Sequence, residues 1–448
     1  MSLDLAVIIL AAGKGTRMKS DRAKVLHEVA NLPMIGHAAR AAESLDPTRI
    51  IIVHGPDGND IAEAARTACA KPDAVITAIQ HEAKGTGHAV LAARESMAGF
   101  NGLAIVAFGD TPLLRPETFT PMVEQAKTGA KIIVMGFEAA DPGPYGRLVT
   151  DKTGTLIKIV EAKDASPEEA AINLVNGGIM AVHTDILFPL LDKLTPNNAQ
   201  GEYYLTDLPA LAREDNIATE VSIGAEEDVM GINSRIDLAA AEKVMQQRLR
   251  HAAMAEGATL VDPDSTFFSY DTKLGRDVWV GPNVWFGPGV TVADNVEIKP
   301  MSHLEGATVA SDCWVGPYGR LRPGAELAEG AKVGNFVEIK KATLAKGAKV
   351  SHLTYIGDAS VGEEANIGAG TITCNYDGFD KFKTEIGARA FIGSNSTLVA
   401  PVTIEDDGFT AAGSTITKKV EAGSLAFGRA KQSAIKGWVA KFRARKNS

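Results

Sequence analysis

The second half of the chain carries an aliphatic residue at every sixth position, and this repeat restricts the possible fold more than any other feature. A sixfold period belongs neither to an α-helix nor to an ordinary strand. It is typical of a parallel β-helix, in which each short side of a triangular coil directs one aliphatic residue inward. The predicted inward residues are Leu274, Val280, Phe286, Val292, Ile298, Leu304, Val309, Val315, Leu321, Leu327, Val333, Ile339, Leu344, Val350, Ile356, Val361, Ile367, Thr373, Ile386, Ile392, Leu398, Ile404, Thr410 and Ile416.

The repeat is interrupted conspicuously once, between Thr373 and Ile386. The residues in between, CNYDGFDKFKTE, are polar and aromatic, so we expect them to project from the coil as a loop. Interruptions of a solenoid tend to lie on its binding face. A surface loop without a function is the alternative.

The first half of the chain follows a different pattern. Apolar, strand-like runs at 6–10, 49–53, 103–108 and 131–137 alternate with helix-like segments at 34–45, 60–70 and 88–97. This alternation predicts an α/β domain with a mostly parallel, Rossmann-like sheet, whose ligands bind at the carboxyl ends of the strands. We expect this domain at 1–235, a linker helix at 236–256 and the β-helix domain at 257–448.

Composition and charge limit the class of protein. The chain has 448 residues, enough for two or three domains, and a formal net charge of -9, which disfavours nucleic acid and anionic membranes as partners. Its three cysteines have no disulfide or zinc spacing. The apolar run at 7–12 is too short to span a bilayer and lacks a basic flank, so we expect neither membrane insertion nor a signal peptide. A cytoplasmic location is the expectation.

The segment Leu10-Ala11-Ala12-Gly13-Lys14-Gly15-Thr16-Arg17-Met18 directly follows the first predicted strand. It has neither the spacing of a P-loop nor the third glycine of a dinucleotide fingerprint. Its glycines nevertheless let backbone amides approach a phosphate, and Lys14, Arg17 and Lys24 add cationic side chains. Phosphate binding is favoured over a structural turn.

Asp110 follows another apolar strand, in FGDTPL. An aspartate at such a position often caps a helix. At the ligand edge of a phosphate-handling sheet, the sharper interpretation is a Mg²⁺ ligand, because Mg²⁺ commonly takes one or two protein ligands together with substrate phosphates.

These motifs occur in an order that resembles the sugar-1-phosphate nucleotidyltransferases. They are LAAGKGTRM with Lys24, QHEAKGTGHA, FGDTPL, YGR, VEAKDA, NGGI, GEYYLTD and GIN. Combined with a hexapeptide domain, they resemble the bacterial family that is both N-acetylglucosamine-1-phosphate uridyltransferase and glucosamine-1-phosphate N-acetyltransferase. The family usually has proline before the lysine matched by Lys24, whereas this chain has Ala23.

The resemblance implies roles for residues of the first domain. Arg17 and Lys24 are the implied catalytic cations, and Asp110 and Asn233 the implied Mg²⁺ ligands. The residues implied in nucleotide and sugar binding are Leu10, Ala11, Ala12, Gly13, Lys24, Gln80, Gly85, Thr86, Gly146, Glu161, Asn176 and Asn233.

In the second half, His352 stands near the loop insertion, and histidine suits general base catalysis at neutral pH. The resemblance implies that His352 is the base of acetyl transfer, and Glu338 is expected to orient it. The implied sugar-phosphate ligands are Arg322, Lys340, Tyr355, Asn366 and Lys381. The implied acetyl-CoA contacts are Ala369, Asn375, Tyr376, Ser394, Ala412 and Arg429.

The expected reactions are acetylation of glucosamine 1-phosphate by acetyl-CoA, followed by uridylyl transfer from UTP to N-acetylglucosamine 1-phosphate with release of pyrophosphate. The product supplies peptidoglycan and lipopolysaccharide synthesis. The family also implies a left-handed β-helix that assembles as a homotrimer. The alternatives are a single-activity nucleotidyltransferase, of the ADP-glucose or GDP-mannose type, whose β-helix is regulatory or structural, and a β-helix that serves only as an oligomerisation scaffold.

Overall fold

The computed structural model describes residues 3–13, 15–198 and 200–446. The chain divides into two compact units, Met1–Gln247 and Arg248–Ser448, and the division falls inside helix α8 (Arg235–Ala255). Among the described helices, none is both long and apolar enough to cross a membrane.

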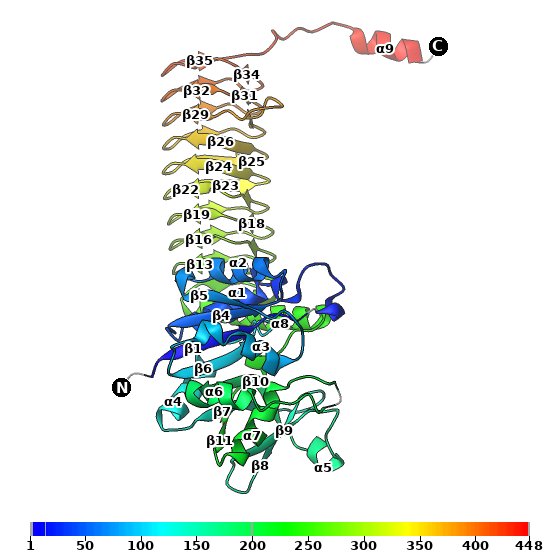
Figure 1. Cartoon of the computed structure of the whole chain (residues 1–448). Coiled ribbons are helices and arrows are strands. Elements are labelled where there is room, and N and C mark those ends of the chain that lie inside the picture. Colours follow the sequence, from blue (N-terminus) through cyan, green and yellow to red (C-terminus); the bar gives the residue numbers. More distant parts are fainter. Residues whose placement is uncertain (1–2, 14, 199, 447–448) are drawn as a thin grey trace. The chain divides into compact units, whose positions relative to one another are not determined.

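The first unit is built on a nine-stranded sheet in the order β5-β4-β1-β6-β10-β7-β11-β9-β8 (Figure 1). Its strands are β1 (Leu5–Leu10), β4 (Arg49–His54), β5 (Val75–Ile79), β6 (Leu103–Phe108), β7 (Ile132–Glu138), β8 (Arg147–Thr150), β9 (Leu156–Val160), β10 (Leu174–His183) and β11 (Thr219–Ile223). The helices are α1 (Met34–Glu43), α2 (Asn59–Ala68), α3 (Thr86–Ala92), α4 (Pro116–Lys127), α5 (Pro167–Ala170), α6 (Thr184–Leu191) and α7 (Leu208–Glu214), and a small hairpin pairs β2 (Glu28–Val29) with β3 (Leu32–Pro33).

The central strands of this sheet are apolar because both faces are covered. In β1, Val7 and Ile9 belong to one hydrophobic core, whereas Ala6 and Ile8 belong to the core on the opposite face. Strands β5, β4, β1 and β6 are parallel, and β10 enters antiparallel between β6 and β7. The predicted α/β domain with a largely parallel centre is confirmed.

The second unit is a parallel β-helix. Its strands are β12 (Thr259–Leu260), β13 (Lys273–Leu274), β14 (Trp279–Val280), β15 (Trp285–Phe286), β16 (Thr291–Val292), β17 (Glu297–Ile298), β18 (His303–Leu304), β19 (Ala307–Val309), β20 (Trp314–Val315), β21 (Arg320–Leu321), β22 (Ala325–Leu327), β23 (Lys332–Asn335), β24 (Glu338–Leu344), β25 (Lys349–His352), β26 (Tyr355–Val361), β27 (Asn366–Ile367), β28 (Ile372–Cys374), β29 (Thr384–Ile386), β30 (Phe391–Ile392), β31 (Thr397–Val399), β32 (Val402–Ile404), β33 (Phe409–Thr410), β34 (Thr415–Ile416) and β35 (Leu425–Ala426). Each strand pairs in parallel with the strand one coil further on, as Val280 does with Ile298.

The predicted ladder forms the core of this unit. Every predicted inward residue from Val280 to Ile416 is buried, and Leu274, at the start, is partly buried against the same core. The interruption after Thr373 is a loop closed by an antiparallel bridge between Tyr376 and Lys381, as expected. Beyond β35 the described residues are exposed and end in helix α9 (Trp438–Lys446).

Candidate functional site

The first candidate site lies at the carboxyl ends of β1 and β6. These strands pair with Leu10 opposite Phe108, so the loops that follow them meet at one edge of the sheet. A cavity of about 280 Å³ opens there. It is lined by the predicted residues Leu10, Ala11, Ala12, Gly13, Lys24, Gln80, Gly85, Thr86 and Asp110, together with Val25, Ala83, Ala89, Phe108 and Glu202.

Lys24 joins the two residues that the sequence assigns to Mg²⁺. Its ammonium group forms an ion pair with Asp110 and donates a hydrogen bond of 3.1 Å to Asn233 Oδ1. The Asp110 and Asn233 loops are themselves linked, because the Ile232 amide donates to the Asp110 carbonyl at 2.9 Å. Asp237 fixes the Asn233 backbone by accepting its amide hydrogen at 3.0 Å.

This donor set fits a hard divalent cation. The carboxylate of Asp110 and the amide oxygen of Asn233 converge on one positive charge, and both are oxygen ligands of the type that Mg²⁺ prefers. No cluster of three or more His, Cys, Asp or Glu side chains that could hold a metal occurs in the described ranges. A divalent cation held by these two oxygens would take its remaining ligands from phosphate and water.

Gln80, predicted to bind the nucleotide, is buried in the lining of this cavity. Its Nε2 donates to the Gly85 carbonyl and lies 3.2 Å from His88 Nδ1. Gly85 has a φ of +102°, and a side chain there would collide with the Tyr203 carbonyl. This position therefore requires glycine, which lets the loop at Gly85 pack closely against the backbone of Tyr203.

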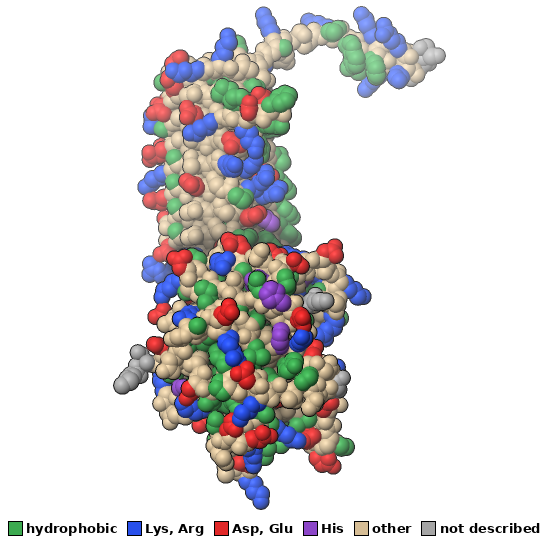
Figure 2. All heavy atoms as spheres, in the orientation of Figure 1, with side chains coloured by type: hydrophobic (Ala, Val, Ile, Leu, Met, Phe, Trp, Pro, Cys, Tyr) green, Lys and Arg blue, Asp and Glu red, His purple; other side chains and the backbone are tan. Residues whose placement is uncertain are grey.

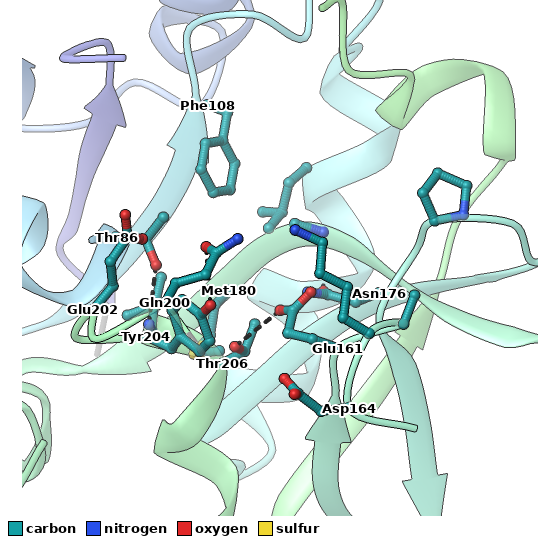
Figure 3. A pocket seen from close by; sticks show the side chains of 16 residues that line it. Thr86, Phe108, Glu161, Asp164, Asn176, Met180, Gln200, Glu202, Tyr204 and Thr206 are labelled. Atoms are coloured by element: carbon teal, nitrogen blue, oxygen red, sulfur yellow. Dashed lines mark hydrogen bonds between the residues drawn. The ribbon is translucent and has the colours of Figure 1, made fainter. Parts of the chain in front are cut away.

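A second cavity of about 370 Å³ adjoins the first through Thr86, Phe108 and Glu202 (Figure 3). Glu161 and Asn176, both predicted to bind the sugar, line it. Glu161 Oε1 accepts from Thr206 Oγ1 at 3.2 Å, and Asn176 Oδ1 accepts from the Gly178 amide at 3.0 Å. Gly146 is not part of the lining, but its carbonyl accepts the Asn176 amide hydrogen at 2.7 Å and thereby holds that residue.

The second cavity also contains residues to which the sequence analysis gave no role. Glu202, Tyr204 and Thr206 line it, all from the GEYYLTD segment that carried part of the resemblance. Burial, followed by the nearby Glu202 and Glu161, raises the pKa of Tyr204, and burial with Glu161 raises the pKa of Asp207. The cavity thus offers the carboxylates of Glu161, Asp164 and Glu202 as acceptors for hydroxyl groups, with Lys163 as a cation in the same lining, whereas Lys24 lines the adjoining cavity.

Other predicted residues of the phosphate loop lie apart from the cavities. Arg17 is exposed in a short 3-10 helix and lines neither cavity, and Lys14 lies outside the described residues. Ala23 has a φ of -55°, within the range of proline. The loop therefore has a proline-compatible conformation at this position without the ring.

The second candidate site is a column of residues on successive coils of the β-helix. Backbone amides donate from Leu353 to the Asn335 carbonyl, from Gly370 to His352, from Asn395 to Ala369 and from Gly413 to Ser394. These bonds place the residues Asn335, His352, Ala369, Ser394 and Ala412 one above another. Three predicted acetyl-CoA contacts, Ala369, Ser394 and Ala412, thus continue the column of His352 over roughly 14 Å, or three coil spacings.

The partner of His352 is not the one that the sequence predicted. His352 Nδ1 lies 2.7 Å from Asn335 Oδ1. Glu338 instead accepts a 2.8 Å hydrogen bond from Arg322 and lies 3.4 Å from Arg320. The expectation that Glu338 orients His352 is wrong for this structure, because the two arginines on the preceding coil engage its carboxylate.

The three predicted sugar-phosphate cations of this unit gather close to one another. The pKa of Lys340 is lowered by loss of solvation and by the charges of Lys381 and Arg322, so these three cations lie close together. The pKa of Arg322 is raised, mainly by its hydrogen bond to Glu338 and to a smaller extent by the nearby Tyr355. Asn366 pairs through β27 with Lys349, and no hydrogen bond or ion pair among the described residues joins it to the cations.

The remaining predicted contacts come from the loop and the last coils. Asn375 is buried and donates to Asp358, whereas Tyr376 is exposed and donates to the Gly378 carbonyl. Arg429 donates to the Ala412 carbonyl at 2.9 Å and so lies at the Ala412 end of the column. Figure 2 shows Lys and Arg side chains gathered on one flank of the β-helix beside hydrophobic ones.

Comparison with known proteins agrees with this two-part architecture. Residues 7–173 match the family model of the MobA-like NTP transferase domain, and residues 383–418 match the hexapeptide repeat of succinyl-transferase.

Three relatives align along almost the whole chain, and each is named Bifunctional protein GlmU. The relative from Paramagnetospirillum magneticum is 50% identical over 445 residues, covering 99% of this chain and 97% of its own. The relative from Dinoroseobacter shibae is 51% identical over 450 residues, which cover 100% of this chain and 99% of the relative. The one from Ruegeria sp. is 53% identical over 433 residues, covering 96% and 95%. With such identity over its full length, the chain belongs to the GlmU family of bifunctional enzymes of UDP-N-acetylglucosamine synthesis.

Proposed function

We propose that the chain carries out its two transfers at the two sites described above. The β-helix site transfers acetyl from acetyl-CoA to glucosamine 1-phosphate. The paired cavities of the first unit transfer uridylyl from UTP to N-acetylglucosamine 1-phosphate. The observation that carries the acetylation half is the column of small residues that continues from His352, together with the cluster of three cations in the same unit, because a scaffold needs only the inward aliphatic ladder.

In uridylyl transfer, the chain binds and aligns the reactants and supplies no covalent group. Backbone amides of residues 11–13 contact the triphosphate, and Gln80, Gly85 and Thr86 contact the uracil. The sugar occupies the acidic cavity, where Glu161 and Asn176 accept or donate to its hydroxyl and acetamido groups. Its phosphate oxygen attacks the α-phosphorus in line, the bond to the β-phosphate oxygen breaks, and pyrophosphate leaves.

Asp110 and Asn233 would hold Mg²⁺, which when bound neutralises phosphate charge. Lys24 lies between these two residues and, among the described residues, is the cation that lines this cavity. Arg17, exposed on the loop, is free to approach the triphosphate from solvent.

In acetyl transfer, the amine of glucosamine 1-phosphate attacks the thioester carbonyl. The N–C bond forms and the C–S bond breaks, while His352 Nε2 takes the proton lost by nitrogen and passes it to the leaving CoA thiolate. Arg322, Lys340, Tyr355 and Lys381 bind the sugar phosphate, with Asn366 as a further contact. The pantetheine arm follows Ala369, Ser394 and Ala412 toward Arg429, with Asn375 and Tyr376 beside the acetyl group.

The molecule assembles as a homotrimer in this proposal. Met301, Tyr318, Phe336 and Leu353, here called the corner ridge, are exposed apolar residues with positive φ on successive coils. Leu353 directly follows His352, so a second copy that covers the corner ridge borders the acetylation site. The three described cysteines are all free, which agrees with a cytoplasmic location.

Two variants test the separation of sites. We expect His352→Ala to abolish CoA release from acetyl-CoA and glucosamine 1-phosphate, with uridylyl transfer nearly intact. We expect Asp110→Ala to abolish Mg²⁺-dependent pyrophosphate release and to spare acetylation. Equal loss of both activities in either variant contradicts separate sites. Wild-type pyrophosphate release without any CoA release would instead favour a single-activity nucleotidyltransferase with a structural β-helix.

A further inference from the structure

The structure assigns Asn335 as a positioning residue that holds the imidazole of His352 in the tautomer required for acetyl transfer. This inference rests on the proposed role of His352 as general base. It concerns a residue of β23, one coil below His352, that no sequence motif singled out.

The contact is set by the register of two adjacent coils. Strands β23 and β25 pair in parallel with Asn335 opposite His352, and the Leu353 amide donates to the Asn335 carbonyl at 3.0 Å. Backbone pairing therefore fixes both Cα positions, and the side chains meet at 2.7 Å between Asn335 Oδ1 and His352 Nδ1. An amide oxygen can only accept, so His352 Nδ1 carries the proton and Nε2 keeps its lone pair.

That tautomer is the one that the reaction needs. A neutral imidazole has one donor and one acceptor nitrogen, and the hydrogen bond made by one nitrogen decides the role of the other. With Nδ1–H bound to Asn335, Nε2 is the nitrogen that can take the proton of the amine. Without an acceptor at Asn335, an exposed imidazole also populates the Nε2–H form, which cannot act as the base through that atom.

Few charges surround this pair. On the strands packed together here, the charged groups are Lys332 on β23 and Lys349 on β25, whereas β27 carries none. Tyr355 begins the next strand, and Glu338 is engaged by Arg322 and Arg320. In the described part of the chain, Asn335 makes the only hydrogen bond to the imidazole ring of His352, whereas the Thr354 hydroxyl donates to the His352 carbonyl.

Two variants of the full-length enzyme test this inference. Asn335→Leu removes the acceptor while keeping the branched shape of the side chain, and is expected to lower kcat of acetylation at least about 10-fold, because part of the general-base contribution is lost. The KM values for acetyl-CoA and glucosamine 1-phosphate should change far less. Asn335→Asp keeps an acceptor, so we expect near-wild-type kcat at alkaline pH. Its carboxylate also stabilises the imidazolium, so the acid limb of the pH profile should move up by roughly one to two units.

Uridylyl transfer by the same protein preparations controls for folding. A wild-type kcat and pH profile in Asn335→Leu overturns the inference, as does an Asn335→Asp enzyme that is inactive at every pH or has an unshifted acid limb. If Asn335→Leu fails to fold, the pH profile of Asn335→Asp decides. His352→Ala distinguishes failure of the proposed function from failure of this inference. If this variant retains acetylation, His352 is not the base. If it loses acetylation while both Asn335 variants behave like the wild type, only the role of Asn335 is contradicted.

Discussion

At the scale of single residues, the position of Lys24 in the first unit depends on a glycine, Gly15, that packs directly against it. Gly15 has a φ of +59°, and a side chain at this position would collide with Lys24. The glycine therefore lets the phosphate loop lie against the Lys24 side chain, whose ammonium group reaches Asp110 and Asn233. Backbone freedom at one residue thus permits the charge contact at another.

The stability of the first unit depends on pH through a partly buried histidine, His37. Burial lowers the pKa of His37 to about 4, and its Nε2 contacts the Val29 carbonyl at 2.8 Å. Between pH 4 and 6.5 the unfolded chain binds the proton that the folded chain excludes, so stability is complete above pH 6.5 and falls as pH falls toward 4.

We expect the free energy of unfolding of the first unit to fall by about 1 to 2 kcal/mol between pH 7.5 and pH 5 through His37 alone. The measurement is urea unfolding of the wild type and of His37→Gln, followed by far-UV circular dichroism. The variant should lose less stability over that pH interval. An identical loss in both proteins would show that His37 does not contribute.

At the scale of elements, the β-helix is stable because most of its short strands bury an aliphatic side chain in one continuous core. Leu398, on β31, is fully buried between coils, whereas Leu425, on β35, is 61% exposed. The same residue type therefore occupies opposite environments within one unit. All four tryptophans of the chain, at 279, 285, 314 and 438, also belong to this unit.

Leu398→Ala should destabilise the second unit by about 2 to 5 kcal/mol, because it leaves a cavity in a closely packed interior. Leu425→Ala is the matched control and should change stability by no more than about 0.5 kcal/mol. Tryptophan fluorescence during denaturant unfolding reports the second unit selectively. Equal effects of the two substitutions would contradict the assignment of Leu398 to the core.

At the scale of the whole molecule, the corner ridge is the feature that a single chain leaves unexplained. The Tyr318 and Phe336 rings stack at 4.8 Å, and each of the four ridge residues is about half exposed or more. Exposed apolar patches of this kind often mark interaction sites, and Leu353 directly follows His352, so the proposed subunit contact would border the proposed acetylation site.

Phe336→Glu should lower the oligomeric state and reduce acetylation strongly, with uridylyl transfer spared, because it places a charge in the proposed subunit contact. Ile223→Glu, at a 58% exposed apolar position of the first unit, is the control and should affect neither. Light scattering after gel filtration gives the oligomeric state. A Phe336→Glu protein that keeps both the wild-type assembly and full acetylation would contradict the proposed contact.

The sequence by itself determined the two folds and most of the first site. The sixfold repeat of inward residues is a local pattern that a β-helix buries. The loops that follow neighbouring parallel strands meet at one edge of the sheet, so the first site could be located from the strand pattern. The tertiary structure decided which side chains pair. Lys24 meets Asn233 across 209 residues of chain, and His352 meets Asn335 instead of involving Glu338, which Arg322 engages. Which side chains pair depends on how the folded chain brings distant segments and coils into register, and on competition between neighbouring charges. The spacing of residues along the chain contains no information on either.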